Sequence, residues 1–213
     1  LELALKLRDA SPSDTEISVL ILNASEKLAR TVAACNISDI TCIEIDAARR
    51  WELHAIADGL SKAIDERGGA DLILLGRECG DSDGGVLPAL VATCLGMPLF
   101  SLAQYARRDL GGISLMREIA DCEEWAALDR PLVASVTNDR RNRLRKPLMK
   151  NVHAARSASI ARSLLELPGS RGRFLSLTAR ASERSRIACR KLAGAPDEQA
   201  AQLARFLVDE TRV

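Results

Sequence analysis

The sequence predicts an α/β fold of the Rossmann-like, doubly wound type, with a mostly parallel sheet and helices on both of its faces. Aliphatic, β-branched segments alternate along the chain with segments of helical spacing, and that alternation is typical of parallel strands joined by crossover helices. The strand-like segments are apolar at nearly every position, as expected of strands buried on both faces. A glycine-rich loop follows one of these strands, at the end where this fold binds ligands.

The chain opens on a helical pattern, residues 1–9. A doubly wound sheet normally opens with a strand, so we expect a first strand to be missing from this chain. EISVLILN, residues 16–23, is the first strand present, and Ser25 is placed to cap the helix that follows. Three apolar residues of that helix share a face at helical spacing, namely Leu28, Val32 and Cys35. We expect the helix to end at Asn36.

Two further strand–helix pairs follow. ITCIEID, residues 40–46, is a strand, and the helix over residues 51–67 repeats apolar residues at helical spacing before Gly68-Gly69 closes it. DLILLG, residues 71–76, is the third strand, and GVLPALVATCLG is the next helix. These repeats build the parallel part of the sheet.

The second half of the chain is less regular. Residues 98–106 and 113–120 have the pattern of shorter strands joined by a turn at Gly111-Gly112, and residues 131–137 form another buried strand. A basic stretch, an alanine-rich helix that ends near Leu167, a glycine-arginine linker and an amphipathic helix from about Asp197 complete the chain. We therefore expect an α/β domain over residues 1–167, and an arm with a helix over residues 168–213 that packs on a partner subunit.

Composition excludes several classes of protein. The 213 residues are 47% hydrophobic, and 30 Lys and Arg against 29 Asp and Glu give a net charge of +1, so no global field attracts nucleic acid or a membrane surface. No apolar run reaches the roughly 18 residues of a membrane span, and we expect a cytoplasmic protein without one. Six scattered cysteines form no CxxC pair, and two histidines form no metal-spaced cluster, so we expect neither a metal site nor catalytic residues.

The glycine-rich loop is the clearest candidate site. Gly76, Gly80, Gly84 and Gly85 lie between a strand and a helix, where backbone N–H groups and a helix N-terminus can hold a phosphate. The loop is neither a Walker motif nor GxGxxG. On spacing alone, a nucleotide site and an ordinary glycine-rich turn remain equally open.

Two motifs and the order of the elements around them point to a known family. The first motif is DLILLGREC with DSDGG, VLP and LGMP, within residues 71–98, and the second is NDRRNRLRK followed by PLMKNVHAA, residues 138–155. The opening ELALKLRD helix and the tail RKLAGAPDEQAAQLARFLVDE fit the same order. On these residues the chain resembles a divergent beta subunit of the electron transfer flavoprotein family, over nearly its whole length.

The resemblance implies a subunit that carries electrons and has no bond-breaking catalysis of its own. Such a beta chain pairs with an alpha subunit that holds most of a redox-active FAD, while the beta chain's loop holds AMP. The pair takes electrons from flavoprotein dehydrogenases and passes them to a quinone-linked or ferredoxin-type acceptor. The cofactor-binding residues it implies here are Asn23, Gly76, Arg77, Asp81, Asp83, Gly84 and Gly85.

The loop departs from the family pattern. The threonine and glutamine that the family uses near phosphate are absent. Gly84 replaces the threonine, and Val86 or a deletion replaces the glutamine. Two side-chain donors are therefore lost, and we expect the AMP site to be degenerate.

The second motif implies a docking segment for the partner dehydrogenase, made of Arg140, Arg141, Asn142, Arg143, Leu144 and Arg145. Arg141 stands where the family has a leucine that inserts into the partner, so we expect docking to an acidic patch instead. A solvated basic face is the plain alternative. Nucleic-acid binding is disfavoured, because no aromatic residue is interleaved for base stacking and aromatics are only 3% of the chain.

Two function classes remain open from sequence. One is the electron-transfer subunit of a heterodimer, and the other is a stand-alone adenine-nucleotide-binding regulatory module of the same fold. The C-terminal segment favours the subunit, because Leu203, Phe206 and Leu207 form an apolar face outside the main sheet.

Overall fold

A computed structural model describes residues 1–76, 85–109, 112–169 and 191–210 of the chain. The chain divides into two compact units, Leu1–Arg173 and Phe174–Val213. The helices of the first unit are α1 (Glu2–Ala10), α2 (Glu26–Ala33), α3 (Leu53–Asp65), α4 (Leu87–Leu95) and α5 (Met149–Ser157), with short 3₁₀ turns η1 (Ala47–Arg49) and η2 (Arg140–Asn142). Its strands are β1 (Ser18–Leu22), β2 (Asp39–Glu44), β3 (Leu72–Gly76), β4 (Leu99–Ala103), β5 (Tyr105–Asp109), β6 (Gly112–Ile119), β7 (Cys122–Ala127), β8 (Leu132–Val136) and β9 (Ala161–Leu164). The second unit contains α6 (Pro196–Glu210).

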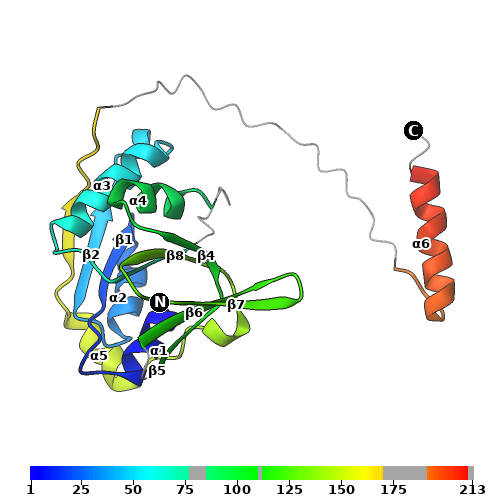
Figure 1. The fold of residues 1–213 in the computed structure, drawn as a ribbon, viewed down its shortest axis with the longest axis horizontal. Helices are drawn as coiled ribbons and strands as arrows, with labels where there is room; N and C mark the ends of the chain where they lie inside the picture. Colours follow the sequence, from blue (N-terminus) through cyan, green and yellow to red (C-terminus); the bar gives the residue numbers. More distant parts are fainter. Residues whose placement is uncertain (77–84, 110–111, 170–190, 211–213) are drawn as a thin grey trace. The chain divides into compact units, whose positions relative to one another are not determined.

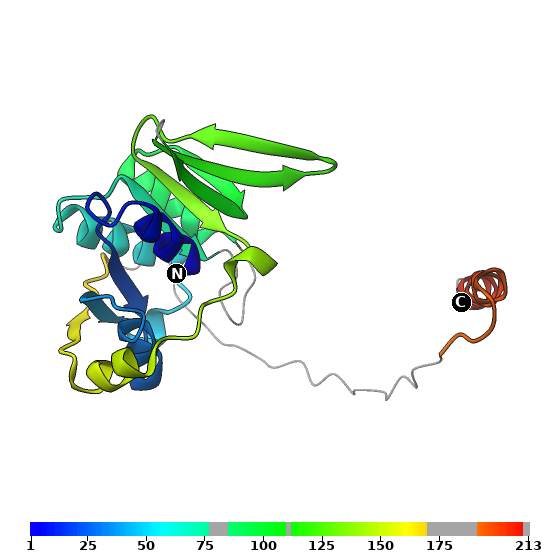
Figure 2. The ribbon, with the colours of Figure 1, turned by 90° about the horizontal axis from the view of Figure 1, so that it is seen from below.

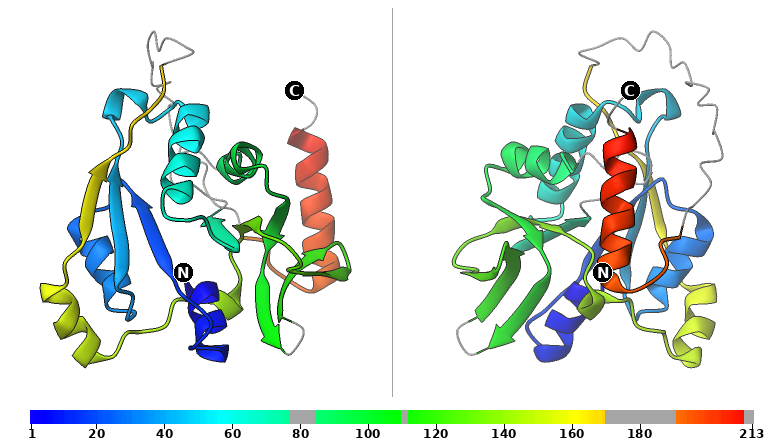
Figure 3. Two further views of the ribbon diagram at one scale, coloured as in Figure 1. Left: turned by 60° about the vertical axis from the view of Figure 1, so that its left-hand side comes forward. Right: turned by 90° about the vertical axis from the view of Figure 1, so that its right-hand side faces the viewer.

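Parallel pairing dominates the first unit. One three-stranded sheet has the order β1-β2-β9 and another has the order β3-β8-β4, and all neighbours in both are parallel. Figure 3 shows β1, β2 and β9 lying side by side. The predicted Rossmann-like α/β class is confirmed.

Helices cover both faces of the parallel strands (Figure 1). Along β1, Leu20 and Leu22 pack into the cluster that contains α3 and α4, whereas Val19 and Ile21 pack into the cluster of α2 and α5. β3 alternates in the same way between α3–α4 on one side and α1 on the other. This alternation explains why the parallel strands are apolar at nearly every position.

The helix predicted after the first strand, α2, starts where expected, and two of the three residues predicted to share its apolar face are buried. The Ser25 hydroxyl accepts a hydrogen bond from the Leu28 N–H at 3.2 Å, as expected of an N-cap, and Asn36 has a φ of 61° just after the helix. Leu28 itself is 47% exposed. Val32 and Cys35 are buried as predicted, together with Ala29 and Ala33.

The strand predicted over residues 98–106 is two strands in different sheets. Leu102 has a φ of 62°, and the pairing of β4 with β8 is irregular between Phe100 and Ala103. The Ser135 hydroxyl accepts from the Leu102 N–H at 2.8 Å and so supports the break. The chain then turns into β5, which pairs antiparallel with β6.

Two strands were not predicted. The CEEWAA strand, β7, pairs antiparallel with β6, and the resulting hairpin, in bright green, extends from the body of the first unit (Figure 2). The predicted alanine-rich helix ends at Ser157 rather than near Leu167, and β9 follows and pairs with β2. Neither segment has the aliphatic, β-branched composition of a buried strand, and every residue of β9 is exposed.

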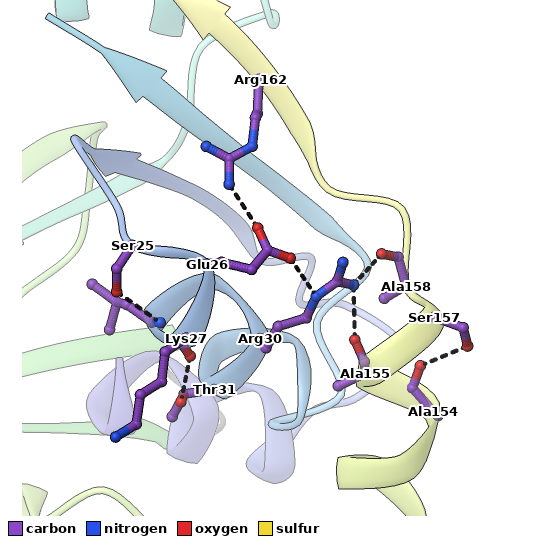
Figure 4. Close-up of polar contacts among 11 residues, drawn as sticks. Ser25, Glu26, Lys27, Arg30, Thr31, Ala154, Ala155, Ser157, Ala158 and Arg162 are labelled. Carbon is purple, nitrogen blue, oxygen red and sulfur yellow. Dashed lines mark hydrogen bonds and ion pairs between the residues drawn. The ribbon is translucent and has the colours of Figure 1, made fainter.

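A polar cluster joins α2, α5 and β9 (Figure 4). The Arg30 guanidinium donates to the carbonyl oxygens of Ala155 (2.9 Å) and Ala158 at the end of α5. Glu26 accepts from both Arg30 and Arg162, at 2.7 Å each. The cluster therefore holds the last helix and strand of the first unit against α2.

Within the described residues, no helix combines the length and the apolar composition that a membrane span requires.

Candidate functional site

The predicted nucleotide loop begins at the carboxyl end of β3. Gly76 is the last residue of that strand, and Gly85, which precedes α4, has a φ of 57°, a left-handed backbone that favours glycine. The predicted residues between them, Arg77, Asp81, Asp83 and Gly84, lie outside the described part of the chain. α4 starts without a side-chain cap on its first turn. Among the described residues, no side chain accepts from the backbone N–H groups at this helix start, where Pro88 itself has none.

Asn23, the remaining predicted cofactor residue, lies in the other parallel sheet, directly after β1. Its side-chain oxygen accepts from the Ile45 N–H at 3.0 Å, and its own N–H donates to the Ile43 carbonyl at 2.7 Å. Its φ is 48°. The side chain thus joins the ends of β1 and β2, and its oxygen already has a structural partner.

The predicted docking segment crosses the surface between β8 and α5. Five of its side chains are exposed, namely Arg140, Arg141, Arg143, Leu144 and Arg145. The Asp139 carboxylate caps η2 by accepting from the Arg141 N–H at 2.7 Å. The segment is exposed, as the sequence predicted, but its residues do not all face outward.

Arg141 is bound by its own molecule. Its guanidinium makes two hydrogen bonds of 2.9 Å to Asp139, lies 3.5 Å from Glu118 and sits over the Tyr105 ring, 5.4 Å from the centroid. The hydrogen bond from the Arg141 side chain, opposed in part by burial, holds the pKa of Asp139 below its ordinary value. The charge of Arg141 is therefore largely compensated within the chain.

Arg145 is bound more firmly still. Its guanidinium lies 2.7 Å from a Glu2 carboxylate oxygen and also contacts Asp9, and its backbone N–H donates to Glu2 at 3.0 Å. The side chain of Glu2 is only 6% exposed. Burial alone raises the pKa of Glu2, but the hydrogen bonds and charge of Arg145 outweigh it, so that this pKa lies below its ordinary value.

Asn142 points inward. Its amide nitrogen donates to the Gln104 carbonyl oxygen, and its side-chain oxygen is buried without a hydrogen-bond partner among the described residues. The Lys6 ammonium donates to the carbonyl oxygen of Arg141. The middle of the segment is therefore attached to both α1 and the β4–β5 connection.

Sequence reasoning missed the residues that hold this segment, Glu2, Lys6, Asp9 and Tyr105. A signal was present for three of them, because Glu2, Lys6 and Asp9 follow one another at helical spacing in the opening helix. Nothing local in the sequence links that helix to a segment more than 130 residues away.

Comparison with known proteins assigns the family. A family model described as the electron transfer flavoprotein domain matches residues 1–163, from α1 into β9. The chain belongs to this family. The match includes the residues of the predicted nucleotide loop and of the predicted docking segment, and the predicted resemblance is confirmed.

The relatives found among curated proteins are named electron transfer flavoprotein subunit beta. Those of Mycobacterium bovis and Mycobacterium tuberculosis (strain H37Rv) are 26% identical over 164 residues, which is 75% of this chain and 61% of each relative. The one from Mycobacterium leprae is 31% identical over 101 residues, 47% of this chain and 38% of the relative. The chain therefore spans less than two thirds of the length of the relatives it matches, and at 26% identity it is a divergent member of the electron transfer flavoprotein family.

Proposed function

We propose that the chain acts as an electron-transfer subunit, paired with an alpha-type subunit that carries most of an FAD. The family match over residues 1–163 is the observation that carries this proposal. The partners proposed on either side are a flavoprotein dehydrogenase as electron donor and a quinone-linked or ferredoxin-type acceptor. In this role the chain positions the cofactor and the donor and catalyses no bond-breaking step itself.

The second unit supports the pairing. Leu203, Phe206 and Leu207 of α6 are 46%, 45% and 54% exposed and lie at helical i, i+3, i+4 spacing. Such an apolar stripe on a separate unit suits a surface on another chain. We propose that this surface belongs to the alpha subunit.

The test is co-expression with an alpha-type chain, followed by size-exclusion chromatography with detection of flavin absorbance. We expect a one-to-one complex that retains FAD. A beta chain that elutes alone as a well-behaved monomer would overturn the subunit role. Adenine nucleotide bound to that monomer would favour the stand-alone regulatory module.

For the loop we propose weak AMP binding by backbone N–H groups at Gly84, Gly85 and the start of α4. The uncapped first turn of α4 fits a phosphate, and the two family side chains that would strengthen the site are absent. Each missing hydrogen bond to a charged phosphate weakens binding by about 1.5–3 kcal/mol.

The measurement is chromatography of the nucleotides released when the purified complex is denatured. We expect FAD with little or no AMP. One equivalent of AMP per complex would show that the loop binds as tightly as an intact site, and the proposed weakening would be wrong.

A further inference from the structure

A cavity of about 260 Å³ is lined by residues of α1, of the end of α2 and of the start of α5. Pockets that hold drug-sized ligands begin at about 300 Å³, so this cavity suits an ion or a small metabolite. No described residue of the glycine-rich loop lines it. The cavity is therefore separate from the site predicted for a nucleotide.

The charged side chains that line this cavity are all cations. They are Arg8, Arg145 and Lys146, and the amides of Asn36 and Asn151 lie beside them. Among the described residues, no Asp or Glu lines the cavity. A lining of this composition attracts an anion.

Arg8 brings a charge that the chain orients but does not compensate. Its guanidinium donates to the carbonyl oxygens of Asn36, at 2.7 Å, and of Cys35, at 3.3 Å. Both acceptors are neutral, and they leave other N–H donors of the guanidinium unused. The side chain is therefore held at the cavity with its charge available to a ligand.

The other two cations differ from each other. The charge of Arg145 is already compensated by Glu2 and Asp9. The Lys146 ammonium is exposed and makes no hydrogen bond or ion pair within the described part of the chain. A ligand in the cavity would therefore meet one held cation, Arg8, and one that is free to turn toward it, Lys146.

The rest of the lining does not oppose an anion. The Cys35 thiol is buried, and burial, with a smaller contribution from the charge of Glu2, raises its pKa, so that the thiol is neutral at pH 7. Leu148 is the N-cap of α5 and makes no side-chain cap there. The positive end of the helix dipole therefore adds to the attraction of the two cations.

The arrangement of the donors favours a phosphate over a carboxylate. Arg8 comes from α1, Lys146 from the segment before α5, and Asn151 from α5 itself. A carboxylate presents its oxygens in one plane, whereas a tetrahedral phosphate presents them in several directions and can accept from all three donors. Arginine and lysine are both common phosphate-binding residues.

We propose that this cavity binds a phosphate group, either as the free anion or on a small metabolite, through the Arg8 guanidinium, the Lys146 ammonium and the Asn151 amide. The bound phosphate would join α1 to the start of α5. The inference does not depend on the proposed electron-transfer role, and it concerns a different place from the glycine-rich loop.

The test is titration calorimetry of the full chain with inorganic phosphate at constant ionic strength. Lys146→Gln should weaken binding about tenfold or more, as expected when one hydrogen bond between charged groups is lost. Lys150→Gln is the matched control, because Lys150 is an exposed lysine nearby that does not line the cavity. It should bind phosphate as the parent does.

Arg8→Gln should weaken binding at least as much as Lys146→Gln. Because this substitution also removes two hydrogen bonds to the end of α2, its thermal unfolding is measured alongside. Lys146→Gln breaks no such bond and decides the result if Arg8→Gln does not fold. Absence of phosphate binding to the parent would overturn the proposal. Equal binding by the parent and Lys146→Gln would overturn it too, since the phosphate would then lie elsewhere.

Two further probes define the ligand. Acetate, titrated in the same way, should bind much more weakly than phosphate, and equal affinities would show that the cavity does not select phosphate. Glycerol 3-phosphate distinguishes the two sources of the group. Tighter binding than inorganic phosphate, lost in Lys146→Gln, would assign the cavity to a phosphorylated metabolite, and weaker binding would assign it to the free anion.

Discussion

At the scale of single residues, the carboxylate of Glu2 fixes the middle of the segment between β8 and α5. This carboxylate is almost entirely buried, and it accepts hydrogen bonds from both the guanidinium and the backbone N–H of Arg145. A buried carboxylate is stable only when its charge has partners of this kind. Replacement of either partner therefore changes the stability of the folded state as well as the position of the segment between β8 and α5.

We predict that Glu2→Gln lowers the free energy of unfolding by about 2 kcal/mol at pH 7, the cost typical of losing hydrogen bonds between charged groups. Because the folded-state pKa of Glu2 lies below its ordinary value of 4.5, this stability is present above that pH and is lost as the pH falls through the folded-state pKa. Urea unfolding at pH 7 and at pH 3 measures the effect.

Glu16→Gln, at an exposed position, is the control for that experiment and should change the unfolding free energy little at either pH. If the difference between Glu2→Gln and the parent were as large at pH 3 as at pH 7, the ion pair would not be its source.

At the scale of elements, α3 and the end of β9 lie unusually close together. A Cβ atom on Gly59 would come within 2.9 Å of the Leu165 side chain, and Leu165 is itself buried in the cluster with α3 and α4. Glycine is unfavourable within a helix, so its presence here is explained by this close approach.

We predict that Gly59→Ala lowers the free energy of unfolding by about 1–3 kcal/mol, as overpacking does elsewhere, although alanine is the better helix former. The cost should shrink in a Leu165→Ala background, since the clash is then removed. Chemical denaturation of the four proteins of this double-mutant cycle decides it. Additive effects of the two substitutions would exclude the clash as the cause.

How well the sequence predicted each element depended on where its stability comes from. β1, β2, β3 and β8 carry their own signal, because both of their faces pack against other apolar residues and their side chains are mostly aliphatic. β9 carries none: it is held by pairing with β2 and by the ion pair from Arg162 to Glu26. The break at Leu102 depends on the Ser135 hydroxyl from another strand, which no local pattern indicates.

The candidate sites also contain some features that have a local sequence signature and others that depend on distant residues. The glycines at either end of the nucleotide loop were predictable, since a strand end and a left-handed backbone at Gly85 have local signatures. The ion pairs of Arg145 were not, because its partners Glu2 and Asp9 lie in α1, and neither was the contact of Arg141 with Glu118 in β6. The sequence shows that this segment is rich in cations, but it does not show which of those charges are already paired with carboxylates.

At the scale of the whole molecule, the two units have different roles in the proposed complex. The first unit has its own buried clusters, whereas α6 exposes its apolar stripe. We predict that Leu203→Ser/Phe206→Ser weakens pairing with the alpha chain at least tenfold and leaves the thermal unfolding of the first unit unchanged. Titration calorimetry or analytical ultracentrifugation gives the affinity.

Arg205→Ser is the matched control on the same helix, since Arg205 is exposed but does not belong to the apolar stripe. Its affinity for the alpha chain should equal that of the parent. A loss of affinity as large as that of the double variant would mean that the helix as a whole, and not its apolar stripe, determines the pairing.

The bond between Glu2 and Arg145 also bears on how the first unit folds during synthesis. The two residues are 143 positions apart in the sequence, and β9 pairs with β2 across a similar separation. Contacts between such distant segments must overcome a large loop-closure entropy before they stabilise anything. The contacts between α1 and Arg145 can therefore form only after most of the first unit has left the ribosome. The segment between β8 and α5 is therefore attached to α1 late in the synthesis of the first unit.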